Sequence, residues 1–177
     1  MAAPTTTYQV LKDTTEHVVI KLTSSWDATS DQENNPHRIQ ANTLYGALDS
    51  SKANLLASTA NTGPLDYYGL TIHRLWYDTT NAGSGDVELF WYATSPKTIM
   101  LLSGNSEYDG AGNWVTIPNN ASGTAGCNGD IGIKTRGMIA NSSYTIVIEL
   151  RKDNAYYQRG QITDPGSFNY GNYSIRP

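Results

Sequence analysis

Three histidines, His17, His37 and His73, are the side chains of this sequence best suited to bind a transition metal or to transfer a proton at neutral pH. They are scattered along the chain, and none belongs to an HExxH motif or to another paired spacing typical of zinc sites. His17 and His73 fall in segments whose pattern predicts β-strands. We therefore interpret both as partly exposed strand residues, and the sequence predicts no metal site and no cofactor.

Nucleophilic and phosphate-binding motifs are missing as well. Cys127 is the only cysteine and has no neighbouring histidine or basic residue to lower the pKa of its thiol, so we interpret it as a bystander. The chain has no G-x-S-x-G elbow and no GxxxxGK[ST] loop. Glycines recur every third residue around Cys127, but no helix is predicted after them. This segment is predicted to be a loop.

Alternating oxygen ligands occur once, in Asn105-x-Glu107-x-Asp109-Gly110, which resembles half of a calcium-binding loop. The bidentate glutamate that would close such a loop is missing, because Thr116 stands six positions after the glycine. A polar turn between strands explains the same residues. Whether this segment binds calcium is left open.

Two carboxylates, Glu88 and Glu149, lie within the strongest strand patterns. Both alternate with apolar residues and are predicted to point outward into solvent. A pair of carboxylates for glycoside hydrolysis could still converge from distant strands, and this alternative stays open. With no catalytic constellation in the sequence, we predict that the protein is not an enzyme.

Aromatic residues are the one positive signal, with 12 Tyr and 4 Trp against 2 Phe. Tyr and Trp combine an apolar body with a polar group, which suits contact surfaces. Trp76, Trp91 and Trp114 are assigned to the core. We expect Trp26 to anchor its long polar loop or to face a partner. The candidate interaction surface comprises the aromatics of loops and tail, namely Trp26, Tyr67, Tyr68, Tyr156, Tyr157, Tyr170 and Tyr173.

The elements that would position these residues are short strands. Three aromatic and β-branched runs, at 70–77, 87–93 and 98–103, are separated by turn-forming clusters and predict an antiparallel meander. Segments 16–23 and 144–151 alternate cleanly between apolar and polar residues. The whole pattern predicts an all-β, antiparallel β-sandwich of jelly-roll type, with about eight strands and at most one short helix near 42–50.

The 177 residues suit one domain. We predict a flexible N-terminal arm at 1–7, a single sandwich domain at 8–163 and an extended tail at 164–177. The net charge is −4 and no Lys/Arg cluster occurs, so neither nucleic acid nor a membrane surface is an expected partner. A single cysteine and an N-terminus without the features of a signal peptide favour synthesis in a reducing cytosol.

Three motifs point to a known group of proteins. The segments IHRLWYDTTNAGSGDVELFWYAT, LLSGNSEYDGAG and NGDIGIKTRGMIANSSYTIVIELRK occur in this order between Val10 and Lys152. This pattern resembles small virion structural proteins of marine tailed bacteriophages, of the cyanophage and pelagiphage type. The motifs are strand patterns rather than catalytic signatures, and the tail after Asp153 is not covered by the resemblance.

The resemblance implies a non-enzymatic capsid-decoration (cement) protein, assembled in the host cytoplasm and bound to the major capsid protein as a homo-oligomer on the virion. Such a protein reinforces a shell through many small contacts that are repeated by symmetry. The segments 1–7 and 164–177 are candidate arms for reaching a neighbouring subunit. Two alternatives stay open: a protein of the tail, neck or fibre, and a carbohydrate-binding module for host-surface glycans.

Overall fold

A computed structural model describes residues 3–27, 32–56, 62–82, 85–110, 112 and 115–158. Within these ranges the chain is nearly all β, as predicted. The strands are β1 (Thr5–Asp13), β2 (His17–Ser25), β3 (Asn34–Ile39), β4 (Leu70–Thr80), β5 (Asp86–Trp91), β6 (Lys97–Leu102), β7 (Asn105–Asp109), β8 (Ile117–Pro118), β9 (Ile131–Arg136) and β10 (Ser143–Lys152). The predicted tail at 164–177, with Tyr170 and Tyr173, and Trp114 lie outside the described residues.

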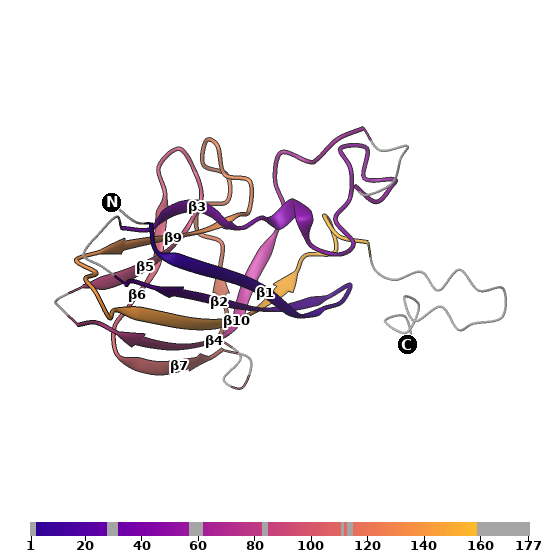
Figure 1. The fold of residues 1–177 in the computed structure, drawn as a ribbon. Coiled ribbons are helices and arrows are strands. Elements are labelled where there is room, and N and C mark those ends of the chain that lie inside the picture. Colours follow the sequence, from indigo (N-terminus) through magenta and orange to yellow (C-terminus); the bar gives the residue numbers. More distant parts are fainter. Residues whose placement is uncertain are drawn as a thin grey trace.

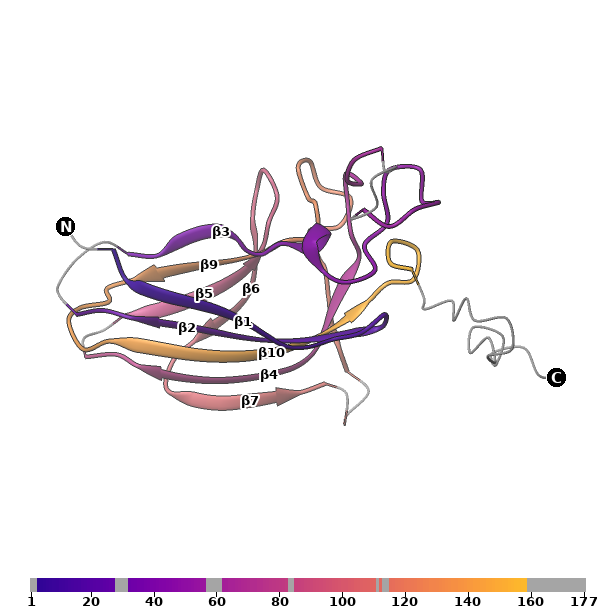
Figure 2. The same cartoon turned by 45° about the vertical axis from the view of Figure 1, so that its right-hand side comes forward.

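The strands form two antiparallel sheets that stack as two layers, shown from two directions in Figures 1 and 2. The larger sheet has the order β1-β2-β10-β4-β7, with the short β8 also paired to β4, and the smaller sheet has the order β3-β9-β5-β6. Without β1 and β8, each sheet has four strands and the chain crosses between the sheets at most connections. This is the eight-stranded jelly-roll arrangement that the sequence predicts.

The core lies between the two sheets and follows from the period of two in the strands. In β2, Val18, Ile20 and Leu22 are fully buried while the residues between them are only partly buried. β10 alternates in the same way, and its register places Ile148 opposite Ile20. Since successive side chains of a strand point to opposite faces, these two central strands supply one wall of the core.

A β-bulge interrupts this period in β4. Glu149 of β10 pairs with Arg74 and the next residue of β10, Leu150, pairs with Ile72, so His73 is an extra residue in β4. Before the bulge, Leu70 and Ile72 are buried; after it, Leu75 is buried. The extra residue therefore places His73 and Arg74 together on the outer face and reverses the phase of the rest of the strand.

Several predicted boundaries need correction. The helix expected near 42–50 is a single 3-10 turn at Ala41–Thr43, because Leu44 already has an extended backbone (φ −72°, ψ 147°) and Gly46 then adopts a left-handed conformation (φ +82°). The strand β1 begins at Thr5, inside the predicted N-terminal arm. The segment from Asn105 to Asp109, expected to be a polar turn, forms β7, and the polar loop after Trp26, which we expected to extend to His37, ends where β3 begins at Asn34. In the described part of the chain, no helix has the length and apolar character needed to span a membrane.

Candidate functional site

Trp26 is buried and does not present a surface to a partner. Its side chain is only 1% exposed and its ring lies 6.1 Å from the ring of Tyr144. Its backbone amide donates to the carbonyl of Ser142 at 3.0 Å. Of the two roles expected for this residue, the described contacts match the anchoring one, because they attach the end of β2 to the turn before β10.

The four loop tyrosines pack against one another instead of forming an exposed surface. Tyr68 and Tyr157 are each 1% exposed, which contradicts the expectation of a contact role at those two positions. The hydroxyl of Tyr68 donates to the carbonyl of Leu48 at 2.6 Å, and burial raises the pKa of Tyr157. Tyr67 and Tyr156 are partly buried, with their rings edge to face at 5.2 Å. This tyrosine cluster fastens the segment around residue 48 to the end of β10.

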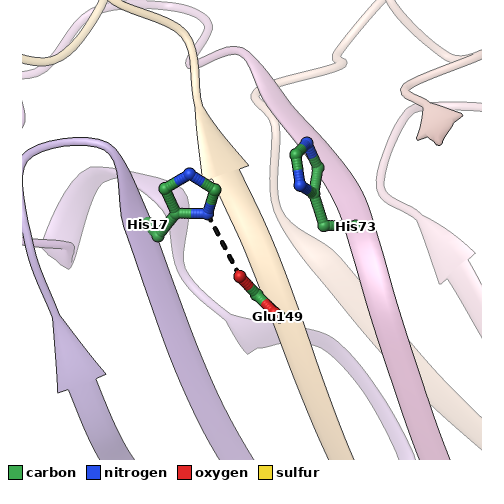
Figure 3. A group of neighbouring side chains, drawn as sticks. All are labelled: His17, His73 and Glu149. Carbon is green, nitrogen blue, oxygen red and sulfur yellow. Dashed lines mark ion pairs between the residues drawn. The ribbon is translucent and has the colours of Figure 1, made fainter. Parts of the chain in front are cut away.

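The outer face of the larger sheet carries a group of residues with chemical potential. His17 of β2, Glu149 of β10 and His73 of β4 come from three neighbouring strands, and their side chains gather on one face (Figure 3). One nitrogen or oxygen atom of each side chain lies within 4.8 Å of those of the other two. His17 Nδ1 is 3.3 Å from Glu149 Oε1, and the two imidazole rings meet edge to face at 5.2 Å.

Arg74 lies near the carboxylate oxygen of Glu149 that faces away from His17, and Asp109 contacts Arg74. Arg74, the second residue of the bulge, places Nη1 3.9 Å from Glu149 Oε2. The Nε of Arg74 donates to Asp109 Oδ1 of β7 at 3.0 Å. One carboxylate oxygen of Glu149 therefore faces His17 and the other faces the Arg74–Asp109 pair, which restricts the rotation of the carboxylate.

Two observations describe the electrostatics of the imidazoles. Partial burial, with a contribution from the neighbouring His17, lowers the pKa of His73 below its ordinary value, so this ring is neutral at neutral pH. His17 Nδ1 is buried and makes no hydrogen bond within the described residues, although Glu149 Oε1 is near. His73 therefore offers a ring nitrogen with a lone pair on the face of the sheet that carries the contact between His17 and Glu149.

A groove next to this group is lined by Trp76, which corrects its assignment to the core. The bulge turns Trp76 outward, where it is half-buried and donates from Nε1 to Glu107 Oε2 at 3.1 Å. The groove has a volume of about 470 Å³ and is lined mainly by Trp76, Asp78, Asn105, Glu107, Thr145 and Val147. Trp91, in contrast, is fully buried, as predicted.

The calcium interpretation of Asn105, Glu107 and Asp109 does not fit the structure. All three belong to β7 and pair with Asp78, Trp76 and Arg74 of β4 in an extended ladder. Alternate residues of a strand are about 6.6 Å apart, whereas calcium ligands must converge to about 2.4 Å from one ion. The carboxylates of Glu107 and Asp109 instead accept hydrogen bonds from Trp76 and Arg74 of the neighbouring strand.

An exposed edge strand is the second notable surface. β1 pairs only with β2, and its first eight residues are all exposed. Three of these carry large apolar side chains, with Tyr8 41%, Val10 43% and Leu11 50% exposed. The register shifts between Val10 and Lys12, so the regular part of the edge runs from Thr5 to Val10. The sequence pattern did not indicate this exposure.

The histidine–glutamate group was also missed by sequence reasoning. The alternation in 16–23 and 144–151 predicts outward positions for His17 and Glu149, and this is correct. No linear pattern shows that β10 lies between β2 and β4, or that a bulge redirects His73. One signal in the sequence could have indicated the bulge. In segment 70–77 the apolar residues Ile72 and Leu75 are three positions apart, which breaks the period of two.

Comparisons with known proteins add no relative: no family model matches the chain, and neither a curated protein nor a solved structure is significantly similar to it.

Proposed function

We propose that this protein is a non-enzymatic bacteriophage virion protein that decorates the capsid and binds the major capsid protein. The observation that carries the proposal is the exposed edge of β1, a nine-residue strand at the border of a jelly roll. Jelly rolls are frequent in viral capsid and lectin domains, although a fold alone does not define a function. The resemblance of the strand motifs to marine phage virion proteins supports the same proposal.

Strand addition is the physical basis of this role. The free side of an edge strand offers backbone N–H and C=O groups to a strand of another chain, and exposed side chains add apolar contacts. The regular stretch of β1 for such pairing runs from Thr5 to Val10, before the register shift at Leu11, and within it the carbonyl of Thr7 already accepts a hydrogen bond from Arg38 at 2.7 Å. One short strand per copy makes a weak contact, and symmetric repetition over a shell multiplies it.

Binding to capsids that lack the decoration protein tests this proposal. We expect the purified chain to bind such capsids and to raise their melting temperature. The double variant Tyr8→Lys/Val10→Lys should lose binding, because it places two charges on the proposed contact. It should keep its fold, since both side chains are more than 40% exposed.

Leu101→Lys is the matched control, because Leu101 is 56% exposed but lies on β6, at the edge of the other sheet. Equal binding by the double variant and the wild type would exclude β1 as the contact. Binding to tail, neck or fibre components, with none to capsids, would move the protein to another position in the virion.

A second candidate function is glycan binding by the Trp76 groove. An aromatic ring beside Asp78, Asn105 and Glu107 combines an apolar surface with hydrogen-bonding groups, the composition that sugar rings require. A glycan array should then give hits that Trp76→Ala abolishes. Hits that survive this substitution, or an array without hits, would count against the groove as a receptor site.

A further inference from the structure

We propose that His17, His73 and Glu149 form a binding site for a divalent transition metal, with Zn²⁺ as the best match. The site lies on the outer face of the larger sheet (Figure 3) and goes beyond the proposed role in the virion. Two imidazole nitrogens and a carboxylate oxygen are a ligand set that zinc commonly takes in proteins. The same set is a poor match for Ca²⁺ or Mg²⁺, which prefer oxygen ligands throughout.

The distances are compatible with a tetrahedral site after a small adjustment. Zinc bonds of 2.0–2.1 Å to nitrogen and oxygen place the ligand atoms about 3.3 Å apart around a tetrahedral ion. The distance from His17 Nδ1 to Glu149 Oε1 is already 3.3 Å. His73 offers a ring nitrogen within 4.8 Å of one ligand atom of each of the other two residues. Rotation of the partly exposed side chains would close this gap without a change in the backbone.

The contact between His17 and Glu149 shows that two of the three groups already converge. His17 Nδ1 lies 3.3 Å from Glu149 Oε1, an ion-pair distance at which the geometry does not make a hydrogen bond. A cation bound between these two atoms would replace this direct contact with two metal–ligand bonds.

Residues around the site resemble the supporting shell of a metal centre. Arg74 contacts the Glu149 oxygen that faces away from His17, and Asp109 in turn fixes Arg74. Hydrogen-bonded or charged partners of this kind orient ligating carboxylates. The bulge of β4 supplies both His73 and Arg74, and bulges often redirect side chains at functional sites.

Positive charges near the site lower its expected affinity for Zn²⁺. Arg74 lies within the group, and Arg151 pairs with His17 across the strands, so two guanidinium groups oppose a bound cation. Glu149 and Asp109 offset part of this charge. The three protein ligands leave the fourth position of zinc open to water or to a side chain from another molecule.

Isothermal titration calorimetry with ZnCl₂ on the untagged chain at pH 7.5 tests the proposal. We expect one Zn²⁺ per chain, and Co²⁺ in its place should give the visible absorption of a tetrahedral centre. His17→Gln, His73→Gln and Glu149→Gln should each weaken binding at least 10-fold. His37→Gln is the matched control, since His37 lies on β3 of the other sheet and contacts Asp130.

Circular dichroism must show that each variant is folded, and histidine NMR of the wild type provides an independent measurement. Zinc should shift the imidazole signals of His17 and His73 and leave those of His37 unchanged. The absence of zinc binding to the wild type would overturn the proposal. Binding that persists in all three ligand variants, or that is lost equally in His37→Gln, would overturn it as well.

Discussion

At the residue scale, the interior contains a charged group whose role is structural. Lys152 at the end of β10 has a fully buried side chain, and Nζ contacts Asp13 together with the carbonyl oxygens of Thr14 and Tyr45. Burial lowers the pKa of this amine, and Asp13 acts in the opposite direction. One ammonium group thereby connects the end of β1 and the segment around residue 45 to β10.

Replacement of this lysine should therefore be costly. Lys152→Met leaves Asp13 Oδ1 and two carbonyl groups without the lysine donor, while the Tyr45 amide still donates to Asp13 Oδ2, and we expect the free energy of unfolding to fall by about 3 kcal/mol. Urea denaturation measures this change. The exposed Lys134 of β9 supplies the control, because Lys134→Met should change stability by less than about 0.5 kcal/mol. A loss at position 152 no larger than at position 134 would show that the buried contacts are not stabilising.

Asp49 predicts a pH dependence. Its carboxylate accepts hydrogen bonds from Ser51 Oγ at 2.5 Å, Asn54 Nδ2 at 3.3 Å and the Thr62 amide at 3.3 Å. The bond from Ser51 is the largest cause that lowers the pKa of Asp49, to about 2. A carboxyl group with a lowered pKa stabilises the fold above its unfolded value of about 3.9, and this contribution disappears as the pH falls toward the folded value.

The Asp49→Asn variant isolates this contribution. We expect the wild type to melt at a higher temperature than the variant at pH 5, and the difference to shrink between pH 4 and pH 2. Thermal melts at matched pH and ionic strength give the comparison. A difference that stays constant over this range would mean that Asp49 stabilises the loop without a change in its ionisation.

At the element scale, the β4 bulge determines what the outer face displays. Without His73, the strand would read Ile72-Arg74-Leu75 and keep its apolar residues inward without interruption. Deletion of His73 should therefore cost only about 1 kcal/mol. Deletion of Trp76 leaves the bulge in place but turns Asp78 toward the core, which should prevent stable folding. Thermal melts of the two deletion variants test this contrast, and equal damage from both would contradict it.

The same bulge explains which parts of the fold could be predicted from sequence. Regular alternation identified β2 and β10, whose inward residues are all buried, and Trp91 of β5 was correctly placed in the core. Trp76 was misplaced because a single inserted residue reverses the phase of a strand. The pattern from Asn105 to Asp109 predicts a turn because Tyr108, which packs against the core, is its one residue with a large apolar body.

The candidate site was predictable only in part for a related reason. The outward direction of His17 and Glu149 is a local property, which the pattern of each strand determines. Their proximity to His73 depends on the order β2-β10-β4, and that order results from pairing between segments that are far apart in the sequence. The prediction that Tyr68 and Tyr157 belong to a contact surface was wrong, because both side chains are buried. Their hydroxyls find backbone acceptors inside the protein, so burial was favourable.

At the scale of the whole molecule, the three candidate surfaces described above belong to one sheet. The exposed edge β1, the histidine–glutamate group and the Trp76 groove all lie on the larger sheet. A molecule attached through β1 would therefore keep the outer face beside that edge free for a metal or a glycan. This division allows a structural role and a binding role in one chain.

Our central proposal is that the chain is a capsid decoration protein, and quantitative mass spectrometry of virions purified from cells that produce the chain tests this proposal most directly. The ratio of this protein to the major capsid protein is the quantity to be measured. We predict a fixed ratio that corresponds to hundreds of copies per particle. Absence of the chain from the virions, or a few copies per particle, would contradict the claim.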